Sequence, residues 1–113
     1  MKPLVIILSL LAHSSATFDA ASTCRVVRAG TGRELNPEYA WASHSPAMYA
    51  AIQDKAVIAD VLFSLARRRQ SPRLRTIAIW LAAGTTAVHL VAGANNMRLA
   101  RRGLQAERNM PWR

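Results

Sequence analysis

Three ionisable side chains stand among apolar neighbours: Asp19 and His89 lie in largely apolar stretches, and Lys55 lies in the apolar arc of an amphipathic segment. A carboxylate, an ammonium group and an imidazole can pair with one another, and the same groups can bind an ion or pass a proton. An ionisable group among apolar neighbours is costly unless it is paired, so chemistry is expected at these positions. His89 is more typical of a hydrogen-bonded structural residue than of a proton carrier or metal ligand, because His13 and His44 stand at no ligand spacing from it.

Two of these residues belong to helix faces made of small and polar side chains. In residues 4–24 such side chains recur at three- and four-residue steps, and residues 76–96 show the same spacing. Faces of this kind suit close helix packing, with Asp19 on the first and His89 on the second. The first face comprises Ala12, Ser15, Ala16, Asp19, Ser22 and Thr23, and the second comprises Ala82, Thr85, His89, Ala92 or Gly93, and Asn96.

Lys55 lies in a third segment, residues 47–66, which contains no Gly or Pro and consists of residues that favour a helix. This helix is amphipathic, and Lys55 falls within its apolar arc. The lysine either reaches water along a partly exposed helix or pairs with a buried carboxylate. The polar side of the helix carries Gln53, Asp60, Ser64 and Arg67. The candidates for pairing with Lys55 are Asp19 and Glu34, with Asp54 and Asp60 as local competitors.

The chain of 113 residues has the length of one domain, and its hydropathy indicates the elements that position these side chains. Residues 76–95 contain no Asp, Glu, Lys or Arg. This segment is long enough for a helix that crosses the hydrocarbon core of a bilayer. We predict an all-α, small helical membrane protein with about three transmembrane or membrane-associated helices in a single domain. Its expected elements are a helix over about 4–24, a loop over 25–46, a helix over about 47–66, an Arg-rich loop over 67–75, a transmembrane helix over about 76–96 and a basic tail over 97–113.

The first hydrophobic segment has two interpretations. A positively charged start, an apolar run and small residues at 14–16 match a secretory signal peptide that is removed as residues 1–16. Residues 4–24 are also long enough for one uncleaved transmembrane helix. In the first case the chain is an exported protein, with residues 17–75 outside the cytoplasm and residues 76–95 as its anchor.

The chain carries 15 Lys and Arg against 6 Asp and Glu, a net charge of +9, and most of the basic residues flank the last hydrophobic segment. Five arginines precede it between positions 67 and 75, and five follow it between 98 and 113. Arginines so placed anchor a helix among lipid headgroups. They share no single face of a soluble helix and are not interleaved with stacking aromatics, so we expect the lipid bilayer and no nucleic acid as partner. With three spans, six basic residues fall on one side and eight on the other, which leaves the orientation open.

Composition also removes two common supports of a small fold. Cys24 is the only cysteine, so the chain forms neither an internal disulfide nor a cysteine-rich zinc site. No Gly-x-Ser-x-Gly or His-Glu-x-x-His sequence occurs. We therefore expect no cofactor, no metal and no catalytic residue, and we expect lipid to confine the fold.

The polar positions form an ordered pattern that covers roughly residues 15–98. It consists of Asp19-x-x-Ser22-Thr23, then Gly32-Arg33-Glu34-Leu35-Asn36-Pro37, then Lys55 and Asn95-Asn96. This pattern resembles a group of small bacterial integral membrane proteins described only as a domain of unknown function. The resemblance implies a bundle of about three transmembrane helices in the bacterial cytoplasmic (inner) membrane, with Asp19, Glu34, Asn36 and Lys55 near one another. It favours an uncleaved first helix and implies no activity.

Three functions are compatible with these residues. In the first, a non-enzymatic membrane protein uses its polar core to fix helix packing or to bind a partner helix, from another membrane protein or a second copy. The second is the exported and anchored protein, and the third is an intramembrane proton or ion carrier or enzyme that uses the same side chains. The expected polar core comprises Asp19, Thr23, Glu34, Asn36, Lys55, His89 and Asn95.

Overall fold

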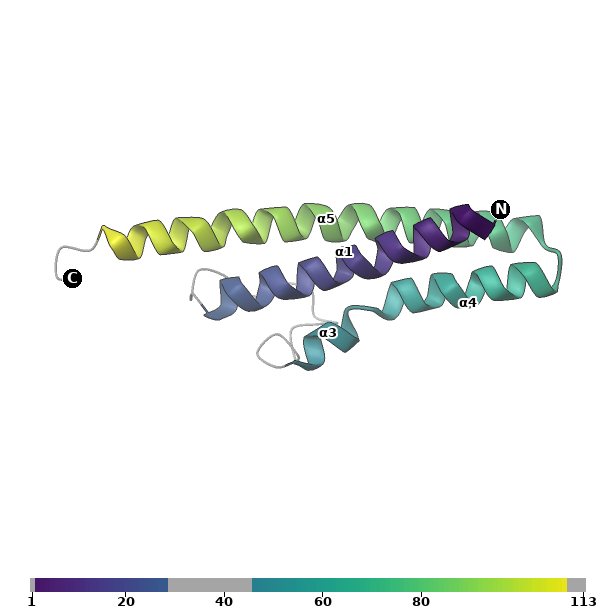
Figure 1. Cartoon of the computed structure of the whole chain (residues 1–113), viewed down its shortest axis with the longest axis horizontal. Helices are drawn as coiled ribbons and strands as arrows, with labels where there is room; N and C mark the ends of the chain where they lie inside the picture. The colour runs from purple at the N-terminus through teal and green to yellow at the C-terminus, as the bar shows by residue number, and fades with distance from the viewer. Residues whose placement is uncertain (1, 29–45, 110–113) are drawn as a thin grey trace.

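The computed structural model describes residues 2–28 and 46–109, which are almost entirely helical (Figure 1). The predicted all-α fold class is confirmed, and no strand occurs within those two ranges. The helices are α1 (Lys2–Arg28), α3 (Ala47–Ala51), α4 (Asp54–Arg68) and α5 (Pro72–Arg108).

α1 and α5 lie side by side and run in the same direction (Figure 1). Asp19 is paired with His89, and about two turns further along α1 the guanidinium of Arg25 reaches the sulfur of Met97. The residue numbers of the contacting positions therefore increase together along the two helices, as they do in a parallel pair. α5 holds 37 residues and α1 holds 27, and α5 extends past the end of α1 (Figure 1).

α4 packs against both α1 and α5 and runs in the opposite direction (Figure 1). Gln53, at the start of α4, meets Thr17, whereas Asp60 in its middle meets the earlier residue His13. As the residue number of the contact increases along α4, that of its partner decreases along α1, so the two helices are antiparallel. The short α3 packs against the middle of α1 through a buried cluster of Ala16, Ala20, Met48 and Ile52.

The middle segment forms two helices where one continuous helix over 47–66 was expected. α3 and α4 are separated by a turn at residues 52–53. The Gln53 side chain bonds to side chains of α1, and the Asp54 carboxylate accepts a hydrogen bond of 2.7 Å from the backbone N–H of Lys55. A carboxylate in the first turn stabilises a helix N-terminus. The break therefore depends on a contact between helices, which the residues of the segment do not reveal by themselves.

The connection between α4 and α5 is shorter than the expected Arg-rich loop over 67–75. α4 continues to Arg68 and α5 starts at Pro72, so residues 69–71 alone connect them. Arginine favours a helix, and proline is tolerated in a first helical turn, so both helices lengthen at the expense of the loop. Gln70 has a positive φ of 48° within this turn.

α1 and α5 are likewise longer than expected. α1 continues beyond residue 24 to Arg28, and α5 continues through much of the expected basic tail. The arginines that follow each apolar stretch are good helix formers, so charge alone does not end these helices. Within them, Lys2–Val27 and Pro72–Gly103 are long and apolar enough to cross a membrane.

Small and polar side chains form the interior of the bundle, and large apolar side chains point outward. Alanine supplies most of the buried apolar positions among the residues that the structure describes. Leu10, Trp80 and Val91, in contrast, are 62%, 74% and 71% exposed. This distribution is the reverse of a water-soluble core and is typical of helices that face lipid. The buried polar residues are Ser15, Asp19, Ser22, Thr23, Thr85 and His89.

A glycine permits one close approach between α1 and α5. Gly93 faces the ring of Phe18, and a Cβ atom at position 93 would overlap that ring. Gly84, on the same helix, has open space where its Cβ would stand. Only the first of these two glycines is therefore required by the packing of α1 on α5.

Candidate functional site

Asp19 and His89 form a buried pair between α1 and α5. Nδ1 of His89 lies 2.7 Å from Oδ2 of Asp19. Asp19 is 6% exposed and His89 is 5% exposed. The imidazole N–H donates to the carboxylate, an interaction that offsets the cost of placing both groups among apolar neighbours. Each residue lies on the small and polar face predicted for its own helix, and the two faces meet.

Asn96, two turns after His89 on α5, extends this pair into a network. Its side-chain nitrogen lies 3.1 Å from Oγ1 of Thr23, 3.3 Å from Oγ of Ser22 and 3.4 Å from Oδ1 of Asp19. The Thr23 hydroxyl donates to the same Asp19 oxygen at 3.4 Å, and the Ser22 hydroxyl donates to the Asp19 carbonyl at 2.8 Å. We refer to these five residues as the Asp19 network.

A second polar cluster joins α1 to α4. Nδ1 of His13 lies 2.7 Å from Oε1 of Gln53, and Nε2 lies 2.8 Å from Oδ2 of Asp60. Gln53 in turn donates from its amide to the Thr17 hydroxyl at 3.0 Å. Both partners of the imidazole are oxygen atoms, so a doubly protonated ring donates to each of them. We refer to His13, Thr17, Gln53 and Asp60 as the His13 cluster.

The polar groups of the interior are satisfied by one another. Within the residues that the structure describes, every buried side-chain nitrogen and oxygen has a hydrogen-bond partner. In the same part of the chain, no three His, Cys, Asp or Glu residues converge as metal ligands would. Polar groups that satisfy one another in this way favour one packing of the helices. The Asp19 network and the His13 cluster each contain a His–carboxylate pair, which is also a group able to exchange a proton.

The structure brings together Asp19, Thr23 and His89 of the expected polar core. Asn95 is not part of the Asp19 network, since it lies on the exposed side of α5, where its Oδ1 accepts a hydrogen bond of 2.8 Å from Arg98. Its neighbour in sequence, Asn96, supplies the amide instead.

Lys55 also stands apart from the Asp19 network. Its Nζ lies 3.1 Å from Oδ2 of Asp54, and the two side chains are 39% and 37% exposed. Of the carboxylates considered for Lys55, Asp54 is in contact with it, and this pair is partly exposed. Glu34 and Asn36, the remaining members of the expected core, lie outside the residues that the structure describes.

Sequence reasoning placed Asn96 on the same helix face as His89, seven residues or two helical turns away, but named Asn95 for the polar core, although Asn95 is rotated off that face. It missed the His13 cluster. For the His13 cluster, Gln53 and Asp60 were placed on one side of a helix, but the pattern did not indicate which helix would cover them. His13 gave no signal of its own, since its partners lie about 40 or more positions away.

The chain matches no protein-family model, no curated protein sequence and no solved structure, so its function is inferred from its own residues and geometry.

Proposed function

We propose that this chain is a small, non-enzymatic integral membrane protein whose α1, α4 and α5 cross the bilayer, and in which the Asp19 network fixes the register of α1 against α5. The observation that carries the proposal is the reversed distribution of side chains. Large apolar side chains cover the outside of the helices, while alanine, hydroxyl groups and paired charges fill the inside. In lipid, such an arrangement pairs the buried polar groups with one another and turns large apolar side chains toward hydrocarbon.

The parallel course of α1 and α5 supports three crossings. Two parallel helices that both cross a bilayer enter it from the same side, so the chain between them must cross back. α4 is antiparallel to both and is available for this return. At 15 residues it is shorter than the apolar spans of α1 and α5. Its Asp60 is paired with His13, and its Val57, Ile58 and Val61 point outward.

The Asp19 network supports a role in register. If α5 slid along α1 by one turn, His89 would lose the carboxylate and Asp19 would be left as an unpaired charge. An unpaired charge at this depth costs far more than a pair, so one alignment of the helices is selected. A protein with one fixed register presents a constant outer surface, which is what binding to a partner helix or a second copy requires.

An uncleaved N-terminus is part of the proposal. Residues 2–16 contain His13 of the His13 cluster, and Val5 and Leu8 pack against the buried cluster that includes Phe63 and Ala78. Removal of residues 1–16 would expose these α4 and α5 side chains and leave Asp60 without its partner. We propose the bacterial cytoplasmic membrane as the location, in line with the sequence resemblance.

Reporter fusions after residues 33, 69 and 108 test the number of spans. Three crossings put the first and third reporters on one side of the membrane and the second on the other. The exported protein with a C-terminal anchor puts the first two outside and the third inside. A pattern of the second kind, or an intact mass of the purified protein that begins at Thr17, would overturn the proposal.

A second candidate, a proton carrier, is favoured by one observation, the presence of two His–carboxylate pairs along α1. Purified protein in vesicles with a pH-sensitive dye inside tests it. A carrier collapses an imposed pH gradient faster than empty vesicles, and the His89→Leu variant abolishes the effect. If wild-type protein leaves the gradient as stable as empty vesicles do, the carrier function is excluded and the structural role stands.

A further inference from the structure

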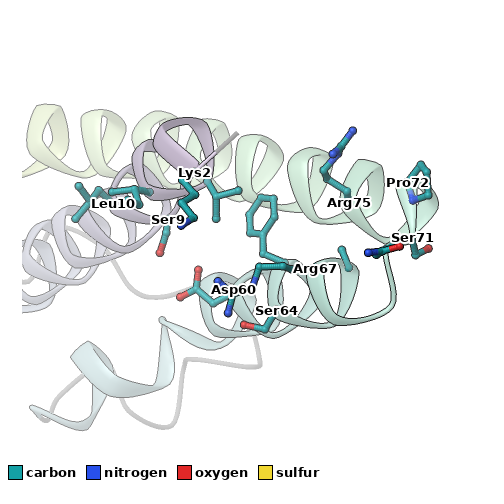
Figure 2. A pocket seen from close by; sticks show the side chains of 14 residues that line it. Lys2, Ser9, Leu10, Asp60, Ser64, Arg67, Ser71, Pro72 and Arg75 are labelled. Atoms are coloured by element: carbon teal, nitrogen blue, oxygen red, sulfur yellow. The ribbon is translucent and has the colours of Figure 1, made fainter.

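An open groove of about 990 Å³ lies between the first half of α1, the second half of α4 and the start of α5 (Figure 2). Its volume is at the upper end of the range found for small-molecule sites. Basic side chains of all three helices line it, namely Lys2, Arg67 and Arg75. Neither the Asp19 network nor the register of α1 against α5 accounts for this groove.

The groove has an excess of positive charge. Asp60 is the carboxylate among its lining residues, and that carboxylate is already bound by His13 at 2.8 Å. Within the residues that the structure describes, Lys2, Arg67 and Arg75 form no ion pair. Three cations around one opening that pair with no carboxylate of the described ranges make a complementary surface for an anion, most of all for a phosphate.

Apolar side chains continue the groove along α1. Val5, Ile6 and Leu10 line it beside Phe63 of α4. They follow Lys2 by three to eight positions, which is about 5–12 Å further along the helix axis. A ligand that fits both parts of the groove therefore has an anionic head and an apolar tail.

The position of the groove matches the depth of a lipid headgroup. The apolar spans of α1 and α5 begin at Lys2 and Pro72, and the groove lies at this end of both helices (Figure 2). At such a boundary basic residues meet the headgroups and apolar residues meet the acyl chains.

We propose that this groove binds one anionic phospholipid, with its phosphate held by Lys2, Arg67 and Arg75 and an acyl chain lying along Val5, Ile6 and Leu10. The proposal rests on the proposed membrane insertion and adds a defined lipid site to it. It differs from a general belt of interfacial arginines because it assigns binding to the residues that line the groove and to no others at the same membrane surface.

The test is native mass spectrometry of the purified full chain in detergent, titrated with phosphatidylglycerol. The groove variant Arg67→Gln/Arg75→Gln is compared with the control variant Arg69→Gln/Arg73→Gln. Both remove two exposed arginines from the same region, but Arg69 and Arg73 do not line the groove. We expect the groove variant to bind phosphatidylglycerol about tenfold or more weakly and the control variant to change affinity less than about twofold.

Two further probes identify the ligand. Phosphatidylcholine, which has the acyl chains without net charge, and inorganic phosphate, which has the charge without acyl chains, should each bind at least about tenfold more weakly than phosphatidylglycerol. Equal losses in the two variants, or equal binding of either probe, would overturn the lipid site. The reporter pattern tests membrane insertion separately, so a three-span pattern with equal losses refutes the lipid site alone.

Discussion

Asp19 accepts hydrogen bonds from two side chains of α5, those of His89 and Asn96, and so joins α1 to α5 directly. Replacing it by leucine leaves the buried imidazole of His89 without its acceptor, whereas Asn96 keeps the hydroxyl groups of Ser22 and Thr23. We expect Asp19→Leu to lower the free energy of unfolding by about 1–3 kcal/mol, measured by denaturant unfolding in detergent. Asn95→Leu, on the exposed side of α5, is the control and should change the free energy of unfolding by less than about 0.5 kcal/mol. Equal effects of the two variants would contradict a register-fixing role for Asp19.

His13 allows a test in which a second substitution restores what the first removes. His13→Leu leaves the carboxylate of Asp60 and the amide oxygen of Gln53 without their donor, so the contact between α1 and α4 weakens. We expect faster cleavage within α4 when a protease is added to the purified protein in detergent. The double variant His13→Leu/Asp60→Leu replaces the partly buried pair by apolar contact, which is often neutral, and should regain most of the protection. A double variant cleaved as fast as the single one would show that the pair does not hold α4.

At the residue scale, helical spacing was a good guide to faces and a poor guide to partners. The steps of three and four residues placed Asp19, Thr23 and His89 on polar faces, and these faces meet. The same spacing cannot say how far one helix is shifted along another, and that shift decides that Lys55 contacts Asp54 and not Asp19. For this reason the polar core could be predicted in part and its pairing could not.

At the scale of the helix, Gly93 sets the distance between α1 and α5 at Phe18. Gly93→Leu would place a side chain where the ring lies, so the helices separate and Asp19 draws away from His89. We expect a loss of about 1–3 kcal/mol in unfolding free energy, measured in detergent. Gly84→Leu introduces the same side chain at an open position and should be neutral or stabilising, because leucine favours a helix. Equal destabilisation by both substitutions would contradict this account of the close approach.

The boundaries of the helices show which elements hydropathy can find. The absence of charge between residues 76 and 95 indicated a helix at the centre of α5, but arginine-rich flanks were taken for loop and tail. Arginine favours a helix and is also the residue that contacts lipid headgroups, so an arginine-rich flank can remain helical. Pro72–Arg108 is therefore one helix. The turn at 52–53 was unpredictable from local sequence, because Gln53 is held by side chains of α1.

At the scale of the molecule, the three proposed spans put six basic residues on one side of the membrane and eight on the other, so the orientation should be sensitive to small changes in charge. Arg98, Arg101 and Arg102 follow one end of the spans, and Arg67, Arg68 and Arg69 precede the other. Basic residues favour the cytoplasmic side. We expect glutamine at positions 98, 101 and 102 to move a reporter after residue 108 toward the outside of the cell. Glutamine at positions 67, 68 and 69 should move the same reporter toward the cytoplasm. Shifts in the same direction, or none in either variant, would show that charge does not orient the chain.

The unbroken length of α5 has a mechanical consequence. Its 37 residues amount to about 55 Å of helix, nearly twice the thickness of a bilayer core, and its end stands beyond that of α1. A membrane span adjusts its tilt to the thickness of the surrounding bilayer. Since the helix has no joint between Pro72 and Arg108, a change in tilt of about 10° swings its far end sideways by about 10 Å. In the proposed membrane arrangement, the position of the basic end of α5 outside the membrane therefore changes with the thickness of the surrounding lipid.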